Sequence, residues 1–152
     1  MGNYLFTEFK AQYIPATLDF WLHTPGIGLG IGDEPESLAA FLVKNEGLSE
    51  VVLHSGQIIA SLLCGTDGRR AYVYHVAVRP EYRGKALGRE LVERCLARLK
   101  GRKLGKVHLF CFADNQAGLA FWDALHFENR SDVVVRSMVI DQPSCGAKTC
   151  IC

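Results

Sequence analysis

The spacing of hydrophobic and polar positions predicts one domain in which helices interleave with a mixed β-sheet. Helical spacing of apolar residues and suitable cap residues predict helices at 15–23, 36–47, 87–101 and 115–125. Alternating or continuous apolar runs predict strands at 4–11, at two sites within 49–65 around a Ser-Gly-Gln turn, and at 71–78, 106–112 and 133–140. The predicted order is β-α-α-β-β-β-α-β-α-β, an α/β (α+β) fold whose middle is antiparallel, which excludes a doubly wound dinucleotide fold.

The last two predicted strands carry further expectations. The nearly all-apolar segment 106–112 predicts a central strand of the sheet. The apolar segment 133–140 predicts a last strand that could pair across a homodimer. We therefore expect one domain over residues 1–140, followed by a tail, 141–152, that contains Cys145, Cys150 and Cys152. The tail lacks a companion histidine or cysteine pair, so no metal site is expected.

Composition narrows the class of protein. The chain has 152 residues, of which 49% are hydrophobic and 22% charged, as is typical of a soluble globular domain. It contains no apolar run long enough for a membrane span, and its first residues do not resemble a secretory signal. We expect a cytoplasmic protein without a membrane partner.

The net charge of +1 conceals an asymmetry along the chain. Residues 79–106 contain ten Lys or Arg and three acids, whereas residues 1–50 contain seven acids and two bases. A basic helix can be a solvated face, but this one begins at a glycine-containing loop. Aromatic residues do not interleave with the bases, so a nucleic-acid partner is not expected.

That loop lies in the stretch "VAVRPEYRGKALGREL", residues 76–91. A strand ends, Pro80 turns the chain, and Gly84 leads into a helix whose unpaired N–H groups carry partial positive charge. Glycine allows close approach of a ligand, and nearby cations favour an anion with several oxygens, such as a pyrophosphate. The spacing fits neither a P-loop nor a G-x-G-x-x-G motif.

The same stretch resembles motif A of the GNAT superfamily of N-acetyltransferases. Val78-Arg79-Pro80, Arg83 and Gly88 match its pattern, whereas Ala86 stands where the family usually has glycine. The segment "FCFADNQAGLAFWDALHF" resembles a second block of the family, with His126 in place of its usual glycine. The order of helices and strands is similar over residues 5–140, which implies a GNAT fold with a splayed strand pair.

The resemblance implies acetyl-CoA as co-substrate, bound where the strands of 76–78 and 109–112 splay apart. Backbone groups of the first strand would bind the pantetheine arm, the loop would hold the pyrophosphate, Asn115 would meet the pantetheine, and two aromatic residues would pack near the thioester. The residues so assigned are Val76, Ala77, Val78, Arg83, Gly84, Lys85, Ala86, Leu87, Gly88, Arg89, Asn115, Phe121 and Trp122. The alternative role for Asn115 is that of a helix cap, and the alternative role for Phe121 is core packing.

Direct attack by an amine on the thioester needs a base for the amine and an acid for the leaving thiolate. Trp122 stands where the family often has a tyrosine acid, so the titratable candidates become Tyr72, Tyr74 and His75. We expect His75 to be the base, since histidine changes charge near neutral pH. Strand alternation predicts Tyr72 and Tyr74 on one face of the sheet and His75 on the other, unless a bulge intervenes.

Two functions remain open at this point. One is an N-acetyltransferase that acts on a primary amine of a small molecule or a protein. The other is a non-catalytic acyl-CoA-binding or regulatory module, suggested by the missing tyrosine and by Ala86. We expect Ala86 to lie already in the first helical turn, where alanine presents its N–H without a positive φ.

Overall fold

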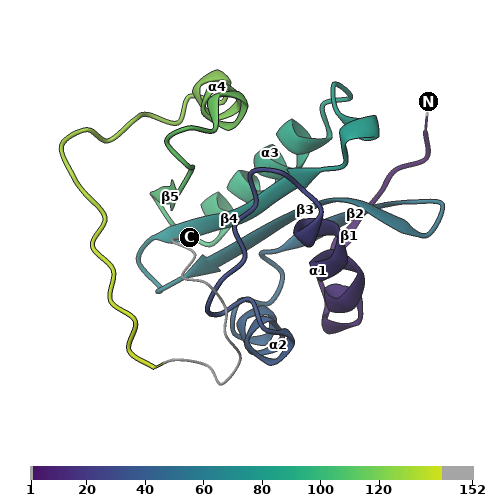
Figure 1. Ribbon diagram of the computed structural model, residues 1–152, viewed down its shortest axis with the longest axis horizontal. Helices are drawn as coiled ribbons and strands as arrows, with labels where there is room; N and C mark the ends of the chain where they lie inside the picture. Colours follow the sequence, from purple (N-terminus) through teal and green to yellow (C-terminus); the bar gives the residue numbers. More distant parts are fainter. Residues whose placement is uncertain (1, 142–152) are drawn as a thin grey trace.

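The structure is a computed structural model that describes residues 2–141, and a five-stranded sheet organises it (Figure 1). Its strands follow the order of the chain across the sheet. The first four pair antiparallel, and the last pair is parallel. The strands are β1 (Leu5–Glu8), β2 (Glu50–His54), β3 (Gln57–Thr66), β4 (Ala71–Val78) and β5 (Val107–Leu109).

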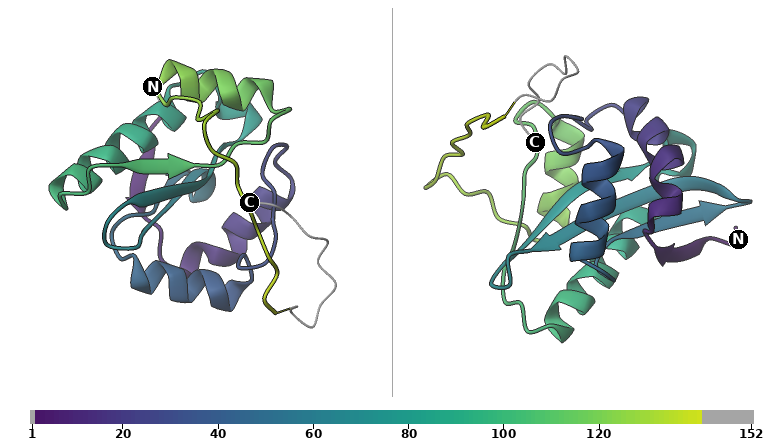
Figure 2. Two further views of the ribbon diagram at one scale, coloured as in Figure 1. Left: turned by 90° about the vertical axis from the view of Figure 1, so that its left-hand side faces the viewer. Right: turned by 90° about the horizontal axis from the view of Figure 1, so that it is seen from below.

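Helices cover both faces of this sheet (Figure 2). Short 3-10 turns at Ala11–Tyr13 and Pro80–Tyr82 precede the first and third helices. One face carries α1 (Ile14–Leu22) and α2 (Pro35–Lys44), and the other carries α3 (Leu87–Gly101) and α4 (Gln116–Ala124). Pro15 and Pro35 lie in the first turns of α1 and α2. Proline is suited to this position, because a backbone N–H in the first turn has no acceptor within the helix.

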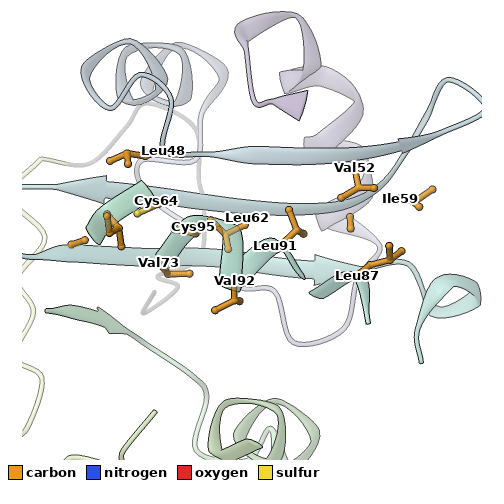
Figure 3. Packing of buried hydrophobic residues seen from close by; sticks show 13 residues of the cluster. Leu48, Val52, Ile59, Leu62, Cys64, Val73, Leu87, Leu91, Val92 and Cys95 are labelled. Carbon is orange, nitrogen blue, oxygen red and sulfur yellow. The ribbon is translucent and has the colours of Figure 1, made fainter. Parts of the chain in front are cut away.

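Each face of the sheet has its own hydrophobic core. The larger core lies under α3, whose buried residues recur at helical spacing and meet the inward side chains of β2, β3 and β4 (Figure 3). The second core packs α1 and α2 on the opposite face, around the fully buried Trp21. A long strand such as β3 is therefore buried on both faces, which explains its nearly continuous apolar sequence.

An ion-pair cluster ties α3 to the start of β2. The buried carboxylate of Glu50 accepts hydrogen bonds from Arg94, at 2.6 Å from Nη2, and from Arg98, at 3.0 Å from Nη1. These bonds raise the pKa of Arg94 above its usual value. Part of the basic character of α3 thus balances one buried acid and is not available to a ligand.

The sequence predicted every helix and the first five strands, but two expectations about the end of the sheet are wrong. The segment 106–112 forms only a three-residue strand, and it lies at the edge of the sheet that residues 2–141 form, not at its centre. The segment 133–140 forms no strand within that part of the chain and is exposed throughout. Phe110 leaves the sheet because β4 and β5 diverge after Leu109.

Of the predicted tail, 141–152, the structure describes only Asp141, so the tail cysteines lie outside the described residues. Among residues 2–141, no helix is both long enough and apolar enough to cross a bilayer.

The start of α3 differs from the sequence expectation. Ala86 is the N-cap of the helix, not a residue of its first turn, and its φ of 61° and ψ of 10° are left-handed. Its carbonyl accepts the first helical hydrogen bond, from the N–H of Glu90 at 2.9 Å. The prediction that alanine avoids a positive φ here is therefore wrong, and the loop holds a conformation that glycine adopts more readily.

This conformation predicts that Ala86→Gly stabilises the protein. A left-handed L-residue costs roughly 1–2 kcal/mol, and the greater freedom of glycine in the unfolded chain takes back about 0.4–1 kcal/mol. We expect a net gain of about 0.5–1 kcal/mol in the free energy of unfolding, measured by urea denaturation. Ala97→Gly, at an exposed position inside α3, is the control and should lose about 1 kcal/mol. Equal losses in the two variants would contradict the strain at Ala86.

Candidate active site

The open edge of β4 forms one wall of the candidate site. β4 pairs with β5 only as far as Val73 opposite Leu109, while β4 itself continues to Val78. Beyond that pair, the side of β4 that faces β5 has no neighbouring strand in the described part of the chain. The backbone over Val76, Ala77 and Val78 can therefore pair with an extended ligand in the manner of a strand.

The end of β4 leads directly into the predicted phosphate loop. The Arg83 Nε donates to the Val78 carbonyl at 3.1 Å, so this side chain folds back over the strand end. Gly84 has a φ of 75°, and the Lys85 ammonium lies 5.5 Å from the centre of the Tyr82 ring. The N–H groups of residues 87–89 precede the first helical hydrogen bond and are free to bind an anion.

Gly88 lies where α3 and α4 face each other beside this loop. A Cβ at Gly88 would lie 3.4 Å from two ring atoms of Phe121 and 3.5 Å from a methyl group of Val78. The Phe121 ring therefore packs against the loop end of β4. The ring of the next residue, Trp122, packs against Phe127, with ring centres 5.0 Å apart. Whether either ring meets the thioester stays a prediction.

Asn115 lies at the start of α4, where three segments come close together. Its Oδ1 accepts a hydrogen bond from the N–H of Gly118 at 3.0 Å, so its role as a helix cap is confirmed. A Cβ at Gly118 would come within 2.6 Å of the Asn115 amide nitrogen and 3.0 Å of the Cys111 sulfur. A Cβ at Gly26 would lie 2.9 Å from the same amide nitrogen. The loop between α1 and α2 thus closes against the N-terminus of α4, across the splayed strands.

A bulge in β4 directs the candidate base. Two residues of β4, His75 and Val76, stand opposite the single residue Leu62 of β3, because Ser61 pairs with Ala77 and Leu63 with Tyr74. His75 has a φ of 48°, as a bulged residue can. Its side chain consequently lies on the α1/α2 face with Tyr74, and not on the opposite face that plain alternation predicts.

The imidazole of His75 is held from two sides. Its Nε2 lies 2.8 Å from Oδ1 of Asp33, and the two side chains are only 8% and 17% exposed. The other carboxylate oxygen of Asp33 accepts the N–H of Gly30 at 2.9 Å. The ring packs on Trp21, with centres 4.7 Å apart. Asp33 lies in the glycine-rich connection between α1 and α2, so this contact joins that loop to the sheet.

A buried chain of hydrogen bonds also holds the backbone of His75 in place. The Trp21 Nε1 donates to the Ser61 hydroxyl at 2.8 Å, and that hydroxyl donates to the His75 carbonyl at 3.2 Å. Trp21 and Ser61 are fully buried, so these bonds form away from water, where they resist exchange with solvent. The chain holds the bulge in place and so fixes the direction of the imidazole.

The two candidate tyrosines lie beside His75 on the α1/α2 face. The rings of Tyr72 and Tyr74 stack with centres 6.3 Å apart, and Tyr74 meets Phe41 of α2 edge-on. Burial, with a smaller contribution from Tyr72, raises the pKa of Tyr74. Its hydroxyl therefore stays protonated at neutral pH and remains able to donate a proton.

Sequence reasoning missed Asp33 as the partner of His75, and it missed Trp21 and Ser61 entirely. The signal for Asp33 was its position in a glycine-rich connection, which the sequence alone does not direct toward any strand. Trp21 and Ser61 read as ordinary core residues, because their hydrogen bond joins positions 40 residues apart.

Known proteins share both the sequence and the fold. The profile of the acetyltransferase (GNAT) family matches residues 14–127. An acetyltransferase from Sodalis glossinidius is 29% identical over 90 residues, and the match covers 58% of this chain and 63% of that protein. This chain thus aligns with somewhat less than two thirds of that relative's length.

Two solved structures have the same fold at low sequence identity. Ard1 from Thermoplasma volcanium superposes with a TM-score of 0.73 at 14% identity, over 82% of each chain. PaiA N-acetyltransferase from Thermoplasma acidophilum, solved with coenzyme A, superposes with a TM-score of 0.70 at 14% identity, over 81% of this chain and 88% of that one. The family profile, the splayed β4–β5 pair and the loop before α3 agree, and this chain belongs to the GNAT family of acetyltransferases.

Proposed function

We propose that this protein is an N-acetyltransferase that transfers the acetyl group of acetyl-CoA to a primary amine of a small molecule or a protein. The observation that carries the proposal is the continuous path along β4. The bulged His75, the open backbone of Val76–Val78 and the anion-binding start of α3 follow one another without interruption. Family membership supports acetyl transfer, and the residues of this path support the assignment of roles.

The successive segments of this path fit the successive groups of acetyl-CoA. An extended pantetheine arm would pair with the open edge of β4, and the pyrophosphate would meet the N–H groups at residues 87–89. Arg83, Lys85 and Arg89 are exposed around this helix start and supply positive charge. No side chain fills the approach at Gly84, where a Cβ would meet nothing within 4 Å. The residues present therefore fit the ligand.

Acetyl-CoA supplies an activated acetyl group, which a neutral amine takes by direct attack. We assign to His75 the role of accepting the proton that the amine must lose. Its Nε2 faces Asp33, which orients the ring and leaves Nδ1 to act as the acceptor of the proton when Nε2 carries hydrogen. Asp33 is a positioning residue, because its carboxylate acts through the histidine.

Tyr74 is the residue we assign to protonate the leaving sulfur. It shares the α1/α2 face with His75, and its hydroxyl, whose pKa burial raises, carries its proton at neutral pH as an ordinary tyrosine does. Trp122, at the position where the family often has a tyrosine, packs against Phe127 and has only an indole N–H to offer. Tyr72, stacked on Tyr74, supports the orientation of that ring.

The second function, a non-catalytic acyl-CoA-binding module, uses the same cleft and predicts a different result. Release of free CoA thiol would be followed with a thiol reagent across a panel of amines, polyamines, amino acids and peptides. The proposed enzyme turns over at least one class of amine. Tight binding of acetyl-CoA without turnover on any of them would favour the binding module.

A substitution at Gly88 tests whether the start of α3 binds acetyl-CoA, with the affinity measured by calorimetry. Gly88→Val places branched methyl groups against Phe121 and Val78, which separates the strand end from the helix start. We expect at least a tenfold loss of affinity with the circular dichroism spectrum retained. Gly88→Ala is the matched control, since its Cβ makes only ordinary contacts at 3.4–3.5 Å, and should bind nearly as the native chain does. Unchanged affinity in the valine variant would overturn this placement of acetyl-CoA.

The base can be tested through the pH dependence of turnover. We expect His75→Ala to lower kcat at least tenfold and to flatten the rise in rate near neutral pH, because its imidazole no longer accepts the proton. Asp33→Asn should lower kcat less and leave the affinity for acetyl-CoA near its native value, since the imidazole loses the partner that orients it while the proposed binding path stays intact.

Asp19→Asn is the control for the second substitution, because Asp19 is an exposed acid on α1 whose carboxylate forms an ion pair with His23 at 3.7 Å. It should leave both kcat and the pH profile unchanged. A native pH profile in His75→Ala would remove His75 as the base. A loss of rate in Asp33→Asn with an equal loss of affinity for acetyl-CoA would reduce Asp33 to a structural role.

A further inference from the structure

A row of aromatic side chains lies on the same face of the sheet as His75. Tyr72 and Tyr74 are alternate residues of β4 and so share the α1/α2 face. The ring centre of Tyr72 lies 6.3 Å from that of Tyr74, 6.3 Å from that of Phe110 and 5.5 Å from that of His108. These distances place His108 and Phe110 beside Tyr72 on this face. We call Tyr72, Tyr74, His108 and Phe110 the aromatic row.

The aromatic row is only partly covered by the rest of the described chain. Phe41 of α2 meets the ring of Tyr74 at its inner end, with centres 6.2 Å apart. Tyr72 and His108 are half-buried, and Phe110 is 49% exposed. Aromatic rings favour offset-stacked and edge-to-face contacts with another flat ring. An open row of rings beside the proposed base therefore suits the flat, apolar body of a ligand.

The inner end of the row is acidic. Oδ1 of Asp33 lies 2.8 Å from Nε2 of His75, and the next residue along the chain, Glu34, is also an acid. The Glu34 carboxylate accepts a hydrogen bond from the N–H of Gly32 at 2.8 Å, which holds it in this loop. Negative charge at this end favours the approach of an ammonium group to the proposed base.

The outer end of the row carries the opposite charge. The N–H of Ala71 donates to the carbonyl of Lys106 at 3.0 Å, which brings the chain at Arg70 and at Lys106 together where β4 and β5 begin to pair. Both side chains are exposed, and neither forms an ion pair within residues 2–141. Two cations without a partner at the end of an apolar surface favour a carboxylate there.

His108 lies where these cations meet the row. Burial, followed by the positive charges of Lys106, Arg70 and Arg130, lowers the pKa of His108. Its ring is thus mainly uncharged at neutral pH and continues the aromatic surface. Arg130 is already paired with Asp132 at 2.7 Å, whereas Arg70 and Lys106 keep their charge for a ligand.

We propose that the acceptors of this site are small molecules in which a flat, unsaturated body separates a primary amine from a carboxylate. The amine reaches His75, the body lies on Tyr72 and Phe110, and the carboxylate binds Arg70 and Lys106. The inference rests on the proposed function, because it names the acceptor class of the same site. It adds four residues that select the acceptor without taking part in the transfer.

Calorimetry in the presence of excess CoA, where no acetyl group can be transferred, measures this recognition. The probe is para-(aminoethyl)benzoate. We expect para-(aminoethyl)benzamide, which keeps the ring and the amine but lacks the charge, to bind about tenfold more weakly. The cyclohexane carboxylate of the same connectivity, which lacks the flat ring, should bind about fivefold more weakly. Equal affinity for the three compounds, or no binding of the benzoate at millimolar concentration, would overturn the proposal.

Substitutions assign the two preferences to their residues. Arg70→Gln with Lys106→Gln should bind the benzoate about tenfold more weakly and the benzamide as the native chain does. Arg69→Gln with Lys100→Gln removes two other exposed positive charges and should leave both affinities unchanged. Phe110→Leu, at an exposed position, should remove most of the preference for the benzoate over the cyclohexane compound. Equal losses in the two double variants would reduce the effect to overall charge and contradict the assignment.

Release of CoA thiol from acetyl-CoA separates this inference from the proposed function. We expect kcat/KM for the benzoate to exceed that for the benzamide by about tenfold. Turnover of other amines without this preference would overturn the acceptor class, while acetyl transfer would stand. Selective binding of the benzoate without turnover of any amine would contradict acetyl transfer and still support recognition by the aromatic row and its cations.

Discussion

The extra residue that β4 accommodates at His75 is the feature on which the site depends. It interrupts the alternation of side chains, so that Tyr74 and His75 share the face of α1 and α2. It also marks the place where pairing with β5 has just ended, which leaves the rest of β4 open to a ligand. One local irregularity therefore places the proposed base directly beside the backbone proposed to bind acetyl-CoA. The hydrogen-bond chain from Trp21 through Ser61 holds the irregularity in place.

Close approach at two glycines brings other segments up to the candidate site. Gly118 allows Cys111 and the side chain of Asn115 to lie close to the α4 backbone. Gly26 brings the loop between α1 and α2 against the same asparagine. The loop that carries Asp33 is thus anchored at two points, one at each side of the splayed strands. A change in that loop would alter the contact of Asp33 with His75 and so the orientation of the imidazole.

Local sequence signals predicted most of the fold. Helical spacing in 87–101, the Ser-Gly-Gln turn and the cap at Asn115 act over a few residues, and each is confirmed. Properties set by distant residues were not predictable in this way. The positive φ of Ala86 and the bulge at His75 are imposed by neighbouring segments, as is the contact with Asp33, 42 positions away. The segment 133–140 has strand composition but forms no strand among the described residues, because strand formation needs a pairing partner that composition does not supply.

The central claim is that the open edge of β4 and the start of α3 form one binding surface for acetyl-CoA. Amide hydrogen exchange with and without CoA, read residue by residue, measures this surface directly. The account predicts protection concentrated in residues 76–89, with a smaller effect at the start of α4 and none in α2. Exchange that stays unchanged across 76–89 while CoA binds would contradict it, since the ligand would then occupy another part of the molecule.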